Sequence, residues 1–225
     1  MWRGSCSGWG KATRSSDRRP KWRPRSFLLC TACLLQVLGG VLEELVLFYV
    51  QKQVRSGSYS IGVAARLGFK CLMLLVVGAR NVAICARSLD QLTSTQQEVQ
   101  AQLKDRGKCI AIDCDVTDEN AVSRMVDTVC TEVGQIDALI NNAGIGHSAK
   151  PFWELPTAEV DTCIRVNVMG VYHVTKAVLN HAQGGMRQSN NGVILNMSSA
   201  AGVRPIQNFS CYCASKFALE VKLQT

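Results

Sequence analysis

The chain has 225 residues, 47% of them hydrophobic, which is enough for one α/β domain with a substantial core. Its 25 lysine and arginine residues exceed its 17 aspartate and glutamate residues, so the formal net charge is +8. Eight of these basic residues lie in the first 25 positions, opposed only by Asp17, and no basic and aromatic recognition motif accompanies them. We therefore interpret residues 1–26 as a basic, disordered leader and expect no nucleic-acid partner.

The cysteines, eleven in number, follow no regular spacing. No C-x-x-C pair has a matching second pair, so the sequence predicts no metal site. An odd number of cysteines also fits a reducing compartment better than a disulfide-linked domain. We expect most of them to be small buried side chains of the core.

Residues 27–42 form a mostly apolar segment, which residues 45–50 resume after Glu43 and Glu44. A helix that crosses a bilayer needs about 20 apolar residues, and glutamates within it are costly. We therefore expect residues 27–50 to be either a membrane anchor or a buried helix. A basic leader before an apolar segment favours a signal anchor in the endoplasmic reticulum with a cytosol-facing domain, and a leader rich in arginine and serine also fits a mitochondrial presequence.

A dinucleotide site needs a glycine-rich turn between the first strand and the first helix, where the backbone approaches the pyrophosphate. The sequence offers two alignments. Residues 56–62 (SGSYSIG) contain two of the three expected glycines, but residues 50–55 before them are too polar for a buried parallel strand. In the second alignment, residues 71–77 are the first strand, and the turn and helix are missing because another strand begins at Asn81. Neither alignment gives an intact phosphate loop.

Strands and helices alternate from residue 81 onward, because short apolar runs alternate with longer segments that carry an apolar stripe of period 3.6. Thr117 and Thr157 are expected to cap the N-termini of the second and third helices of this region. The expected strands are residues 81–86, 109–114, 138–140 and 192–197, and the expected helices are residues 89–106, 117–134, 157–183 and 210–223. This α/β alternation predicts a Rossmann-like, doubly wound parallel sheet in a three-layer α/β/α arrangement.

Several polar residues lie where ligands bind to such sheets. Asn142, Ala143 and Gly144 directly follow a strand, at the end of the sheet where parallel strands bind ligands. Ser199 ends another strand, where its hydroxyl group is placed to hydrogen-bond a carbonyl oxygen that gains charge. Asn167 lies beside the apolar stripe of the long helix, where it would hold either a water near the site or a backbone group. Each position alone equally fits an ordinary polar turn, strand end or helix.

Tyr212 and Lys216 lie four residues apart, on one face of the last expected helix. A tyrosine normally has a pKa of about 10. A nearby ammonium group favours the phenolate and lowers this pKa, so Tyr212 would exchange protons near neutral pH. Taken alone, the same spacing also describes an ordinary pair of helical residues.

In this order, the Asn-Asn-Ala-Gly turn, Asn167, Ser199 and the Tyr-x-x-x-Lys pair resemble the short-chain dehydrogenase/reductase family, and the resemblance covers residues 78–219. It implies that Tyr212 is the catalytic acid and base, and that Lys216 lowers its pKa and binds the nicotinamide ribose. It further implies that Ser199 orients the carbonyl group of the substrate. Asn167 would support a water of the proton relay.

The resemblance also implies a nicotinamide cofactor. The positions that would contact it are Asn142, Ala143 and Gly144, then Asp115 and Val116 beside the adenine, and Tyr212 and Lys216 at the nicotinamide end. Arg87 ends a strand where a guanidinium group suits the 2′-phosphate of NADP, whereas members that prefer NAD usually carry an acidic residue nearby. We therefore expect NADP (NADPH) rather than NAD, although Arg87 would also be unremarkable as a solvated strand end.

Two features depart from the family pattern, namely the degenerate glycine motif and the end of the chain at Thr225. Family members continue through two more strands and the helices of the substrate pocket. Without them residues 193–197 would form an apolar edge strand, and the sheet would be incomplete at its C-terminal edge. We interpret the chain as a splice variant, a fragment or an imperfect gene model. The expected organisation is the leader, the hydrophobic segment at residues 27–50, and a partial domain of this family at residues 51–225.

The function implied by the resemblance is the NADP-dependent interconversion of a carbonyl and an alcohol on a lipophilic small molecule. The surroundings of Tyr212 and the hydrophobic segment are similar to those of 3-ketosphinganine reductases. The alternative is an inactive member of the family that binds other proteins through its exposed sheet edge and helices. By analogy with the family, we also expect a homodimer formed through residues 157–183 and 210–223.

Overall fold

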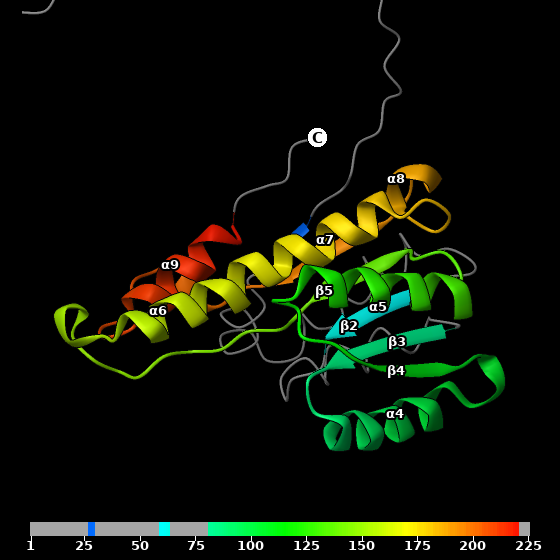
Figure 1. Cartoon of the computed structure of the whole chain (residues 1–225), viewed down its shortest axis with the longest axis horizontal. Helices are drawn as coiled ribbons and strands as arrows, with labels where there is room; N and C mark the ends of the chain where they lie inside the picture. The colour runs from blue at the N-terminus through cyan, green and yellow to red at the C-terminus, as the bar shows by residue number, and fades with distance from the viewer. Residues whose placement is uncertain (1–26, 30–58, 64–80, 221–225) are drawn as a thin grey trace, which may run out of the picture.

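The computed structural model describes residues 27–29, 59–63 and 81–220, which form a parallel sheet with helices packed on it (Figure 1). The order of the strands is β1-β6-β5-β2-β3-β4, and every pair of neighbours is parallel. The strands are β1 (Phe27–Leu29), β2 (Tyr59–Val63), β3 (Asn81–Ala86), β4 (Cys109–Asp113), β5 (Ala138–Asn141) and β6 (Val193–Met197). The predicted Rossmann-like sheet is confirmed, with β3 to β6 within two residues of their expected bounds.

Helices fill the connections between the strands from β3 onward. They are α4 (Leu89–Leu103), α5 (Glu119–Glu132), α6 (Thr157–Ile164), α7 (Gly170–Asn180), α8 (Met186–Ser189) and α9 (Ser210–Ala218). Short 3₁₀ turns lie at η1 (Lys104–Arg106), η2 (Phe152–Glu154) and η4 (Ala200–Gly202), and a π-helical turn, η3 (Arg165–Met169), joins α6 to α7. The sequence predicted α6, η3 and α7 as one long helix and did not predict α8 or η2.

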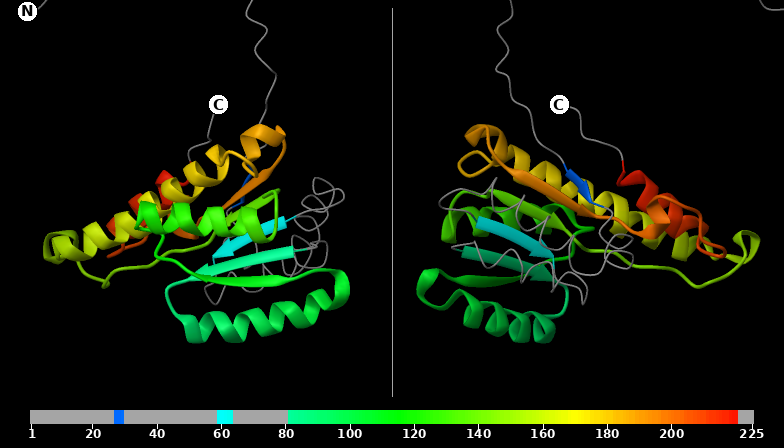
Figure 2. Two further views of the ribbon diagram at one scale, coloured as in Figure 1. Left: turned by 45° about the vertical axis from the view of Figure 1, so that its right-hand side comes forward. Right: turned by 180° about the vertical axis from the view of Figure 1, so that it is seen from behind.

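Both faces of the sheet are covered by helices, as the alternating side chains of β3 show. Val82 and Ile84 share an apolar core with the buried leucines and valine of α4. Ala83 and Cys85, which point to the opposite face, belong to the larger core that α5 and α7 build. The views in Figure 2 show α4 on one side of the sheet and α5 and α7 on the other. The three-layer α/β/α arrangement is therefore confirmed.

The cysteines of the described residues are free thiols, and all of them except Cys130 are buried. Burial and the nearby Cys114 raise the pKa of the Cys85 thiol to about 12. A thiol with so high a pKa is protonated and unreactive at neutral pH. These cysteines therefore contribute to packing, as predicted.

The expectation that β6 forms an open apolar edge was wrong. β1 lies parallel to β6, with Phe27 opposite Leu195 and Leu29 opposite Met197. The backbone of β6 is therefore paired on both sides, with β1 and with β5. The same pairing makes residues 27–29 a strand rather than the start of a helix. The leader and residues 30–50 lie outside the described residues.

The first alignment of the glycine motif, with a turn at residues 56–62, was also wrong. Tyr59–Val63 form β2, which pairs with β3 on one side and with β5 on the other. The second alignment, with a first strand at residues 71–77, falls outside the described residues.

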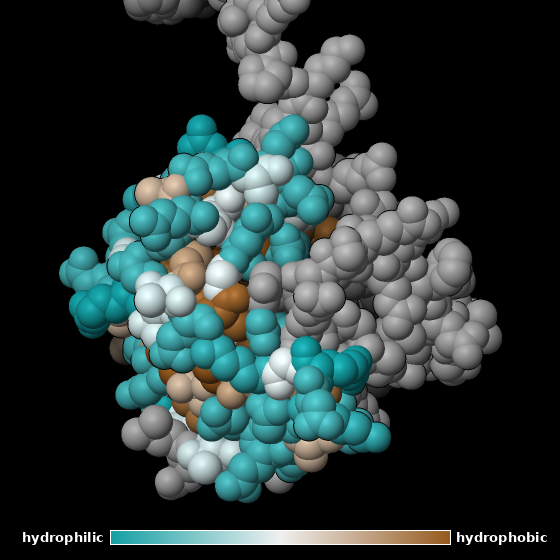
Figure 3. Space-filling view, turned by 90° about the vertical axis from the view of Figure 1, so that its right-hand side faces the viewer, coloured by the Kyte–Doolittle hydropathy of each residue, from teal (hydrophilic) through white to brown (hydrophobic). Residues whose placement is uncertain are grey.

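The amino ends of the strands face the viewer in Figure 3, and this part of the surface is mainly hydrophilic, with apolar residues showing between polar ones. No helix among the described residues is both long enough and apolar enough to span a bilayer. A parallel sheet binds ligands at the opposite end, beyond the carboxyl ends of its strands. The polar residues that the sequence singled out lie at that end.

The cap of α5 differs from the prediction by one residue. Asp118, rather than Thr117, is the N-cap, and its side chain accepts hydrogen bonds from the backbone N–H groups of Asn120 and Ala121. The hydroxyl of Thr117 instead donates to Asp115. Thr157 is not a cap either, because it is the first residue of α6 and Pro156 precedes it without any side-chain cap.

Replacing Asp118 with alanine should therefore lower the free energy of unfolding by about 1 kcal/mol, because two backbone donors at the start of α5 lose their acceptor. Urea denaturation followed by circular dichroism measures this change. Thr117→Ala is the matched comparison, and it should have the smaller effect. A larger loss for Thr117→Ala than for Asp118→Ala would contradict this assignment of the cap.

Candidate active site

The carboxyl ends of β5 and β6 are tied together by side-chain hydrogen bonds. Asn141, the last residue of β5, is buried. Its Nδ2 donates to Oγ1 of Thr175 on α7 at 3.0 Å and to Oδ1 of Asn196 on β6 at 2.9 Å. These bonds fix the end of β5, and with it the position of the turn formed by residues 142–144.

Asn167 holds the segment that follows this turn. Its side chain is completely buried. Its Oδ1 accepts a hydrogen bond from the backbone N–H of Ile145 at 2.8 Å, and its Nδ2 donates to the carbonyl oxygen of Ile145 at 2.9 Å. The same Nδ2 group donates to Oγ of Ser215 at 2.9 Å. The sequence left open whether Asn167 holds a water or a backbone group, and these contacts show that it holds the backbone of Ile145.

A π-helical turn surrounds Asn167. The turn, η3, spans Arg165–Met169 between α6 and α7 and so widens the helix at this residue. Such single π turns inside α-helices are often found at functional sites. Regular helical periodicity placed Asn167 beside the apolar stripe but gave no sign of this turn.

Gly144 lies against both Asn167 and Lys216. A Cβ atom at Gly144 would be 3.3 Å from Nζ of Lys216 and 3.4 Å from Oδ1 of Asn167. Since both distances are short for a Cβ atom, a residue with a side chain would press on both groups. The structure thus brings together the turn after β5, the long helix and the last helix, as the sequence predicted.

Lys216 is almost fully buried, with 4% of its surface exposed. Its Nζ donates to the backbone carbonyl of Met197, at the end of β6, at a distance of 2.8 Å. Burial lowers the pKa of the Lys216 ammonium. The amine is therefore held in place by β6 and surrounded by little water.

Tyr212 lies one helical turn before Lys216 and is partly exposed. Nζ of Lys216 is 5.8 Å from the centre of the Tyr212 ring. The ring of Phe209 packs edge-on against Tyr212, with the two centres 6.4 Å apart. Ser215 connects this pair to Asn167, because its Oγ donates to the carbonyl of Tyr212 at 2.7 Å and accepts from Asn167.

Ser199 lies two residues after the end of β6 and is the N-cap of η4. Its Oγ accepts a hydrogen bond from the backbone N–H of Ala201 at 3.2 Å. The adjacent Ser198 is buried, and its hydroxyl donates to the carbonyl of Lys216 at 3.4 Å. Since η4 packs against α9, Ser199 is held beside the helix that carries Tyr212 and Lys216.

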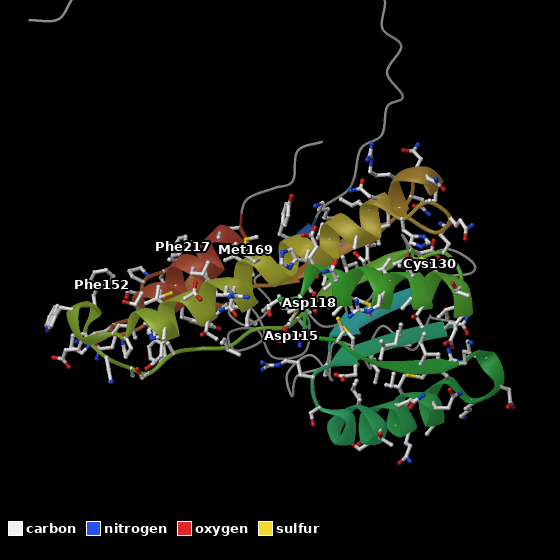
Figure 4. The ribbon with its side chains drawn as sticks, viewed as in Figure 1. Asp115, Asp118, Cys130, Phe152, Met169 and Phe217 are labelled. Carbon is white, nitrogen blue, oxygen red and sulfur yellow. The ribbon has the colours of Figure 1, made fainter. Side chains whose placement is uncertain are left out.

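The predicted adenine-side residues gather at the carboxyl ends of β3 and β4. Arg87 follows β3 and is exposed. The pKa of Asp115 is lowered, mainly by the backbone N–H of Thr117 and further by the charge of Arg87. Val116 is buried and contacts Gly170, where an added Cβ would lie 2.6 Å from a Val116 methyl group. Figure 4 labels Asp115 in the space between β4 and the long helix.

These two groups of residues fit the two ends of a nicotinamide dinucleotide. Gly144 is exposed and has no side chain, so a ligand can approach its backbone next to the Lys216 ammonium. The exposed guanidinium of Arg87 provides a positive charge at the other end. The segment that follows β2, where the pyrophosphate would lie, falls outside the described residues.

Two side chains that contact this site were missed by the sequence analysis. Ser215 sits between Asn167 and Tyr212 and is fully buried. His147 follows the turn, and its ring lies 5.5 Å from that of Phe209. Ser215 could have been predicted to lie at the site, because it is three residues after Tyr212 on the same helical face. Nothing in the sequence pattern indicated His147.

The buried amine of Lys216 leads to a pH-dependent prediction. Because burial lowers its pKa from the usual 10.5, the unfolded state binds more protons than the folded state between the lowered value and 10.5. The free energy of unfolding of the native chain should therefore rise, relative to that of Lys216→Met, as the pH increases from neutral values toward 10.5. Urea denaturation at several pH values measures this difference.

The control for this experiment is Lys104→Met, which removes a lysine that is exposed at the end of α4. Its stability should run parallel to that of the native chain over the same pH range. A constant difference between the native chain and Lys216→Met would contradict the lowered pKa.

Known proteins share this fold and these motifs. A sequence model of the family described as short chain dehydrogenase matches residues 60–224. An NADPH-dependent pterin aldehyde reductase of Arabidopsis thaliana is 31% identical over 71% of this chain and 62% of its own length. A 3-ketodihydrosphingosine reductase of Bacteroides thetaiotaomicron is 40% identical over 51% of this chain and 40% of its own length.

Solved structures agree with this result. A metagenomic short-chain oxidoreductase in complex with NADP superposes with a TM-score of 0.65 and 29% identity, over 73% of this chain and 72% of that one. An NAD⁺-bound xylitol dehydrogenase gives a TM-score of 0.66 and 30% identity, over 72% and 61%. The chain spans about three fifths of the length of the pterin aldehyde reductase and about two fifths of the length of the 3-ketodihydrosphingosine reductase. From its sequence and its fold alike, the chain belongs to the short chain dehydrogenase family.

Proposed function

We propose that this chain is an NADP-dependent oxidoreductase that interconverts a carbonyl and an alcohol on a lipophilic small molecule. The observation that carries the proposal is the position of the Lys216 amine, which lies near the Tyr212 ring and would contact any Cβ placed at Gly144. An ammonium group in this position favours the phenolate of Tyr212, and thus prepares the tyrosine for proton exchange.

Bound NADPH would supply the hydride to the carbonyl carbon. The Tyr212 hydroxyl then donates its proton to the carbonyl oxygen, and takes the proton back in the direction of oxidation. Lys216 stabilises the phenolate that remains. The hydroxyl of Ser199, which the Ala201 N–H fixes, hydrogen-bonds the same substrate oxygen while its negative charge develops.

Asn167 has a positioning role in this proposal. It fixes the backbone of Ile145, next to the cofactor turn, and it reaches the backbone of Tyr212 through Ser215. It would also support the water that returns a proton to Tyr212. The cofactor turn and the catalytic helix therefore keep their relative positions through one buried amide.

Three observations support NADP as the cofactor. Arg87 is exposed at the end of β3, the NADPH-dependent pterin aldehyde reductase is a relative, and the metagenomic oxidoreductase was solved with NADP. Arg87→Glu should weaken NADPH binding by about tenfold or more, because a carboxylate replaces the partner of the 2′-phosphate, and should leave NADH binding nearly unchanged. Fluorescence titration with both cofactors measures this, and equal losses for both would contradict the assignment.

A lipophilic substrate is supported by the segment between Ser199 and Tyr212. Val203 and Ile206 in this segment are exposed apolar side chains. The 3-ketodihydrosphingosine reductase of Bacteroides thetaiotaomicron supports a long-chain ketone in particular. Residues 27–29 of the hydrophobic segment form β1, so association with the endoplasmic reticulum membrane through residues 30–50 belongs to the same proposal, with mitochondria as the alternative.

A homodimer is part of the proposal as well. Met169 on η3 and Phe217 on α9 are large apolar side chains, exposed on elements that pack against each other (Figure 4). Tyr172 on α7 is also exposed. A second copy of the chain would cover these side chains.

The proposal is tested by two measurements on the full chain. Titration with NADPH, followed by the fluorescence of the nicotinamide, tests for cofactor binding. The loss of NADPH absorbance in the presence of a long-chain ketone tests for turnover. Saturable binding together with turnover is the expected result, and the absence of NADPH binding would refute the proposed function.

A further inference from the structure

Residues 203–208 form an exposed segment that leads from η4 to α9, the helix that carries Tyr212. The first end of this segment is tied to η4, because the backbone N–H of Arg204 donates to the carbonyl oxygen of Ala200 at 3.1 Å. The other end is tied to the start of α9, because the N–H of Phe209 donates to the carbonyl oxygen of Ile206 at 3.2 Å. Both ends of the exposed segment therefore have defined positions.

The middle of the segment is held by a buried thiol of α9. Sγ of Cys213 accepts a hydrogen bond from the backbone N–H of Ile206 at 3.3 Å, and the thiol donates in turn to the carbonyl oxygen of Ile206 at 3.9 Å. A thiol is both a weak donor and a weak acceptor, and here it has both roles. Since Cys213 is buried, the core fixes its position. A buried residue of the helix thus determines where the exposed Ile206 lies.

These contacts place the segment beside Tyr212. Ile206 is hydrogen-bonded to residues on both sides of this tyrosine in the sequence, namely Phe209 before it and Cys213 directly after it. The segment follows β6 and lies next to the first turn of α9, beyond the carboxyl ends of the strands, where this fold binds ligands. The apolar side chains of Val203 and Ile206 are exposed there, so a bound molecule can contact them.

We infer that Cys213 is a positioning residue for the apolar part of the substrate. Its thiol keeps residues 203–208 where Val203 and Ile206 contact the hydrocarbon chain of a ketone whose carbonyl lies at Tyr212. This inference rests on the proposed function for the presence of that ketone. It adds a residue that acts on the length of the substrate rather than on its carbonyl. Because Ile206 is exposed, water can replace the thiol as the partner of its N–H, so loss of the thiol should loosen the segment without unfolding the domain.

The kinetic test compares 2-octanone with 2-butanone, which have the same carbonyl group and chains of different length. Cys213→Ala removes both hydrogen bonds to Ile206. It should raise KM for 2-octanone about fivefold, which corresponds to one net hydrogen bond, and should leave kcat for both ketones and KM for 2-butanone nearly unchanged. Cys213→Ser is close in size to Cys213→Ala, but its hydroxyl donates and accepts, so it should restore most of the native KM.

Cys211→Ala is the matched control. Cys211 is also a buried thiol of α9, but it donates to the carbonyl oxygen of Val160 on α6, at 3.6 Å, rather than to the segment. Its KM for both ketones should equal that of the native chain. Three results would overturn the inference: an equal rise in KM for both ketones in Cys213→Ala, a fall in kcat in place of the rise in KM, or the same change in Cys211→Ala.

Two measurements by NMR do not depend on turnover. The backbone N–H of Ile206 should exchange with solvent about fivefold faster in Cys213→Ala than in the native chain and in Cys211→Ala. In the presence of NADP, 2-octanone should shift the methyl resonances of Ile206 in the native chain, and much less in Cys213→Ala. Unchanged exchange, or equal shifts in the two proteins, would overturn the inference. A native chain that shows both differences and yet reduces neither ketone would refute the proposed function and leave this inference standing.

Discussion

Replacement of Tyr212 with phenylalanine is expected to lower kcat for ketone reduction by about a thousandfold, because the substrate oxygen loses its proton donor. Lys216 would remain buried against the Met197 carbonyl, so the cofactor side of the site should be unchanged. NADPH affinity should therefore stay within about twofold of that of the native chain. A loss in kcat without a loss in cofactor binding is the result that distinguishes a catalytic phenol from a structural one.

Tyr172→Phe is the matched control for this substitution. Tyr172 lies on α7, outside the site, with about half of its surface exposed. The substitution removes the same hydroxyl group as Tyr212→Phe does. Its kcat should equal that of the native chain. If Tyr212→Phe retained more than about a tenth of the native kcat, Tyr212 would not be the principal acid and base.

The sequence predicted the part of the fold that local patterns determine. The strands β3 to β6 are short apolar runs bounded by polar residues, and α4 and α5 carry the apolar stripes that the structure buries. The grouping of the candidate site residues was expected as well, because their order along the chain is specific even though each one alone is common. Gly144, Asn167 and Lys216 do meet in the structure.

Elements that depend on distant pairing could not be predicted. β1 and β2 are short segments, and their pairing with distant strands is not visible in local periodicity, since Phe27 pairs with Leu195 of β6 and Ser60 with Ala138 of β5. The N-cap of α5 was misassigned because Thr117 and Asp118 are both good capping residues, and only the hydrogen bond of Thr117 to Asp115 decides between them. The π-helical turn around Asn167 was not predicted either, because a search for a period of 3.6 residues assumes a regular α-helix.

Asn167 is the residue whose loss should destabilise the fold most among those that build the site. Asn167→Ala would leave the partly buried N–H and carbonyl of Ile145 without these partners and would remove a donor to the buried Ser215. Each unsatisfied buried group costs about 1–3 kcal/mol, so the free energy of unfolding should fall by about 3 kcal/mol. This corresponds to a decrease in Tm of roughly 9 °C for a protein of this size, which calorimetry measures.

The control is Asn120→Ala, which removes an exposed asparagine from the first turn of α5 and should change the free energy of unfolding by less than about 0.5 kcal/mol. The position of Asn167 between the cofactor turn and the catalytic helix predicts a second effect. Because the amide fixes Ile145 and, through Ser215, the backbone of Tyr212, its loss should also lower kcat at temperatures where the variant is still folded. A variant with native kcat and reduced stability would show that Asn167 supports the fold alone, and that the positions of Gly144 and Tyr212 do not depend on it.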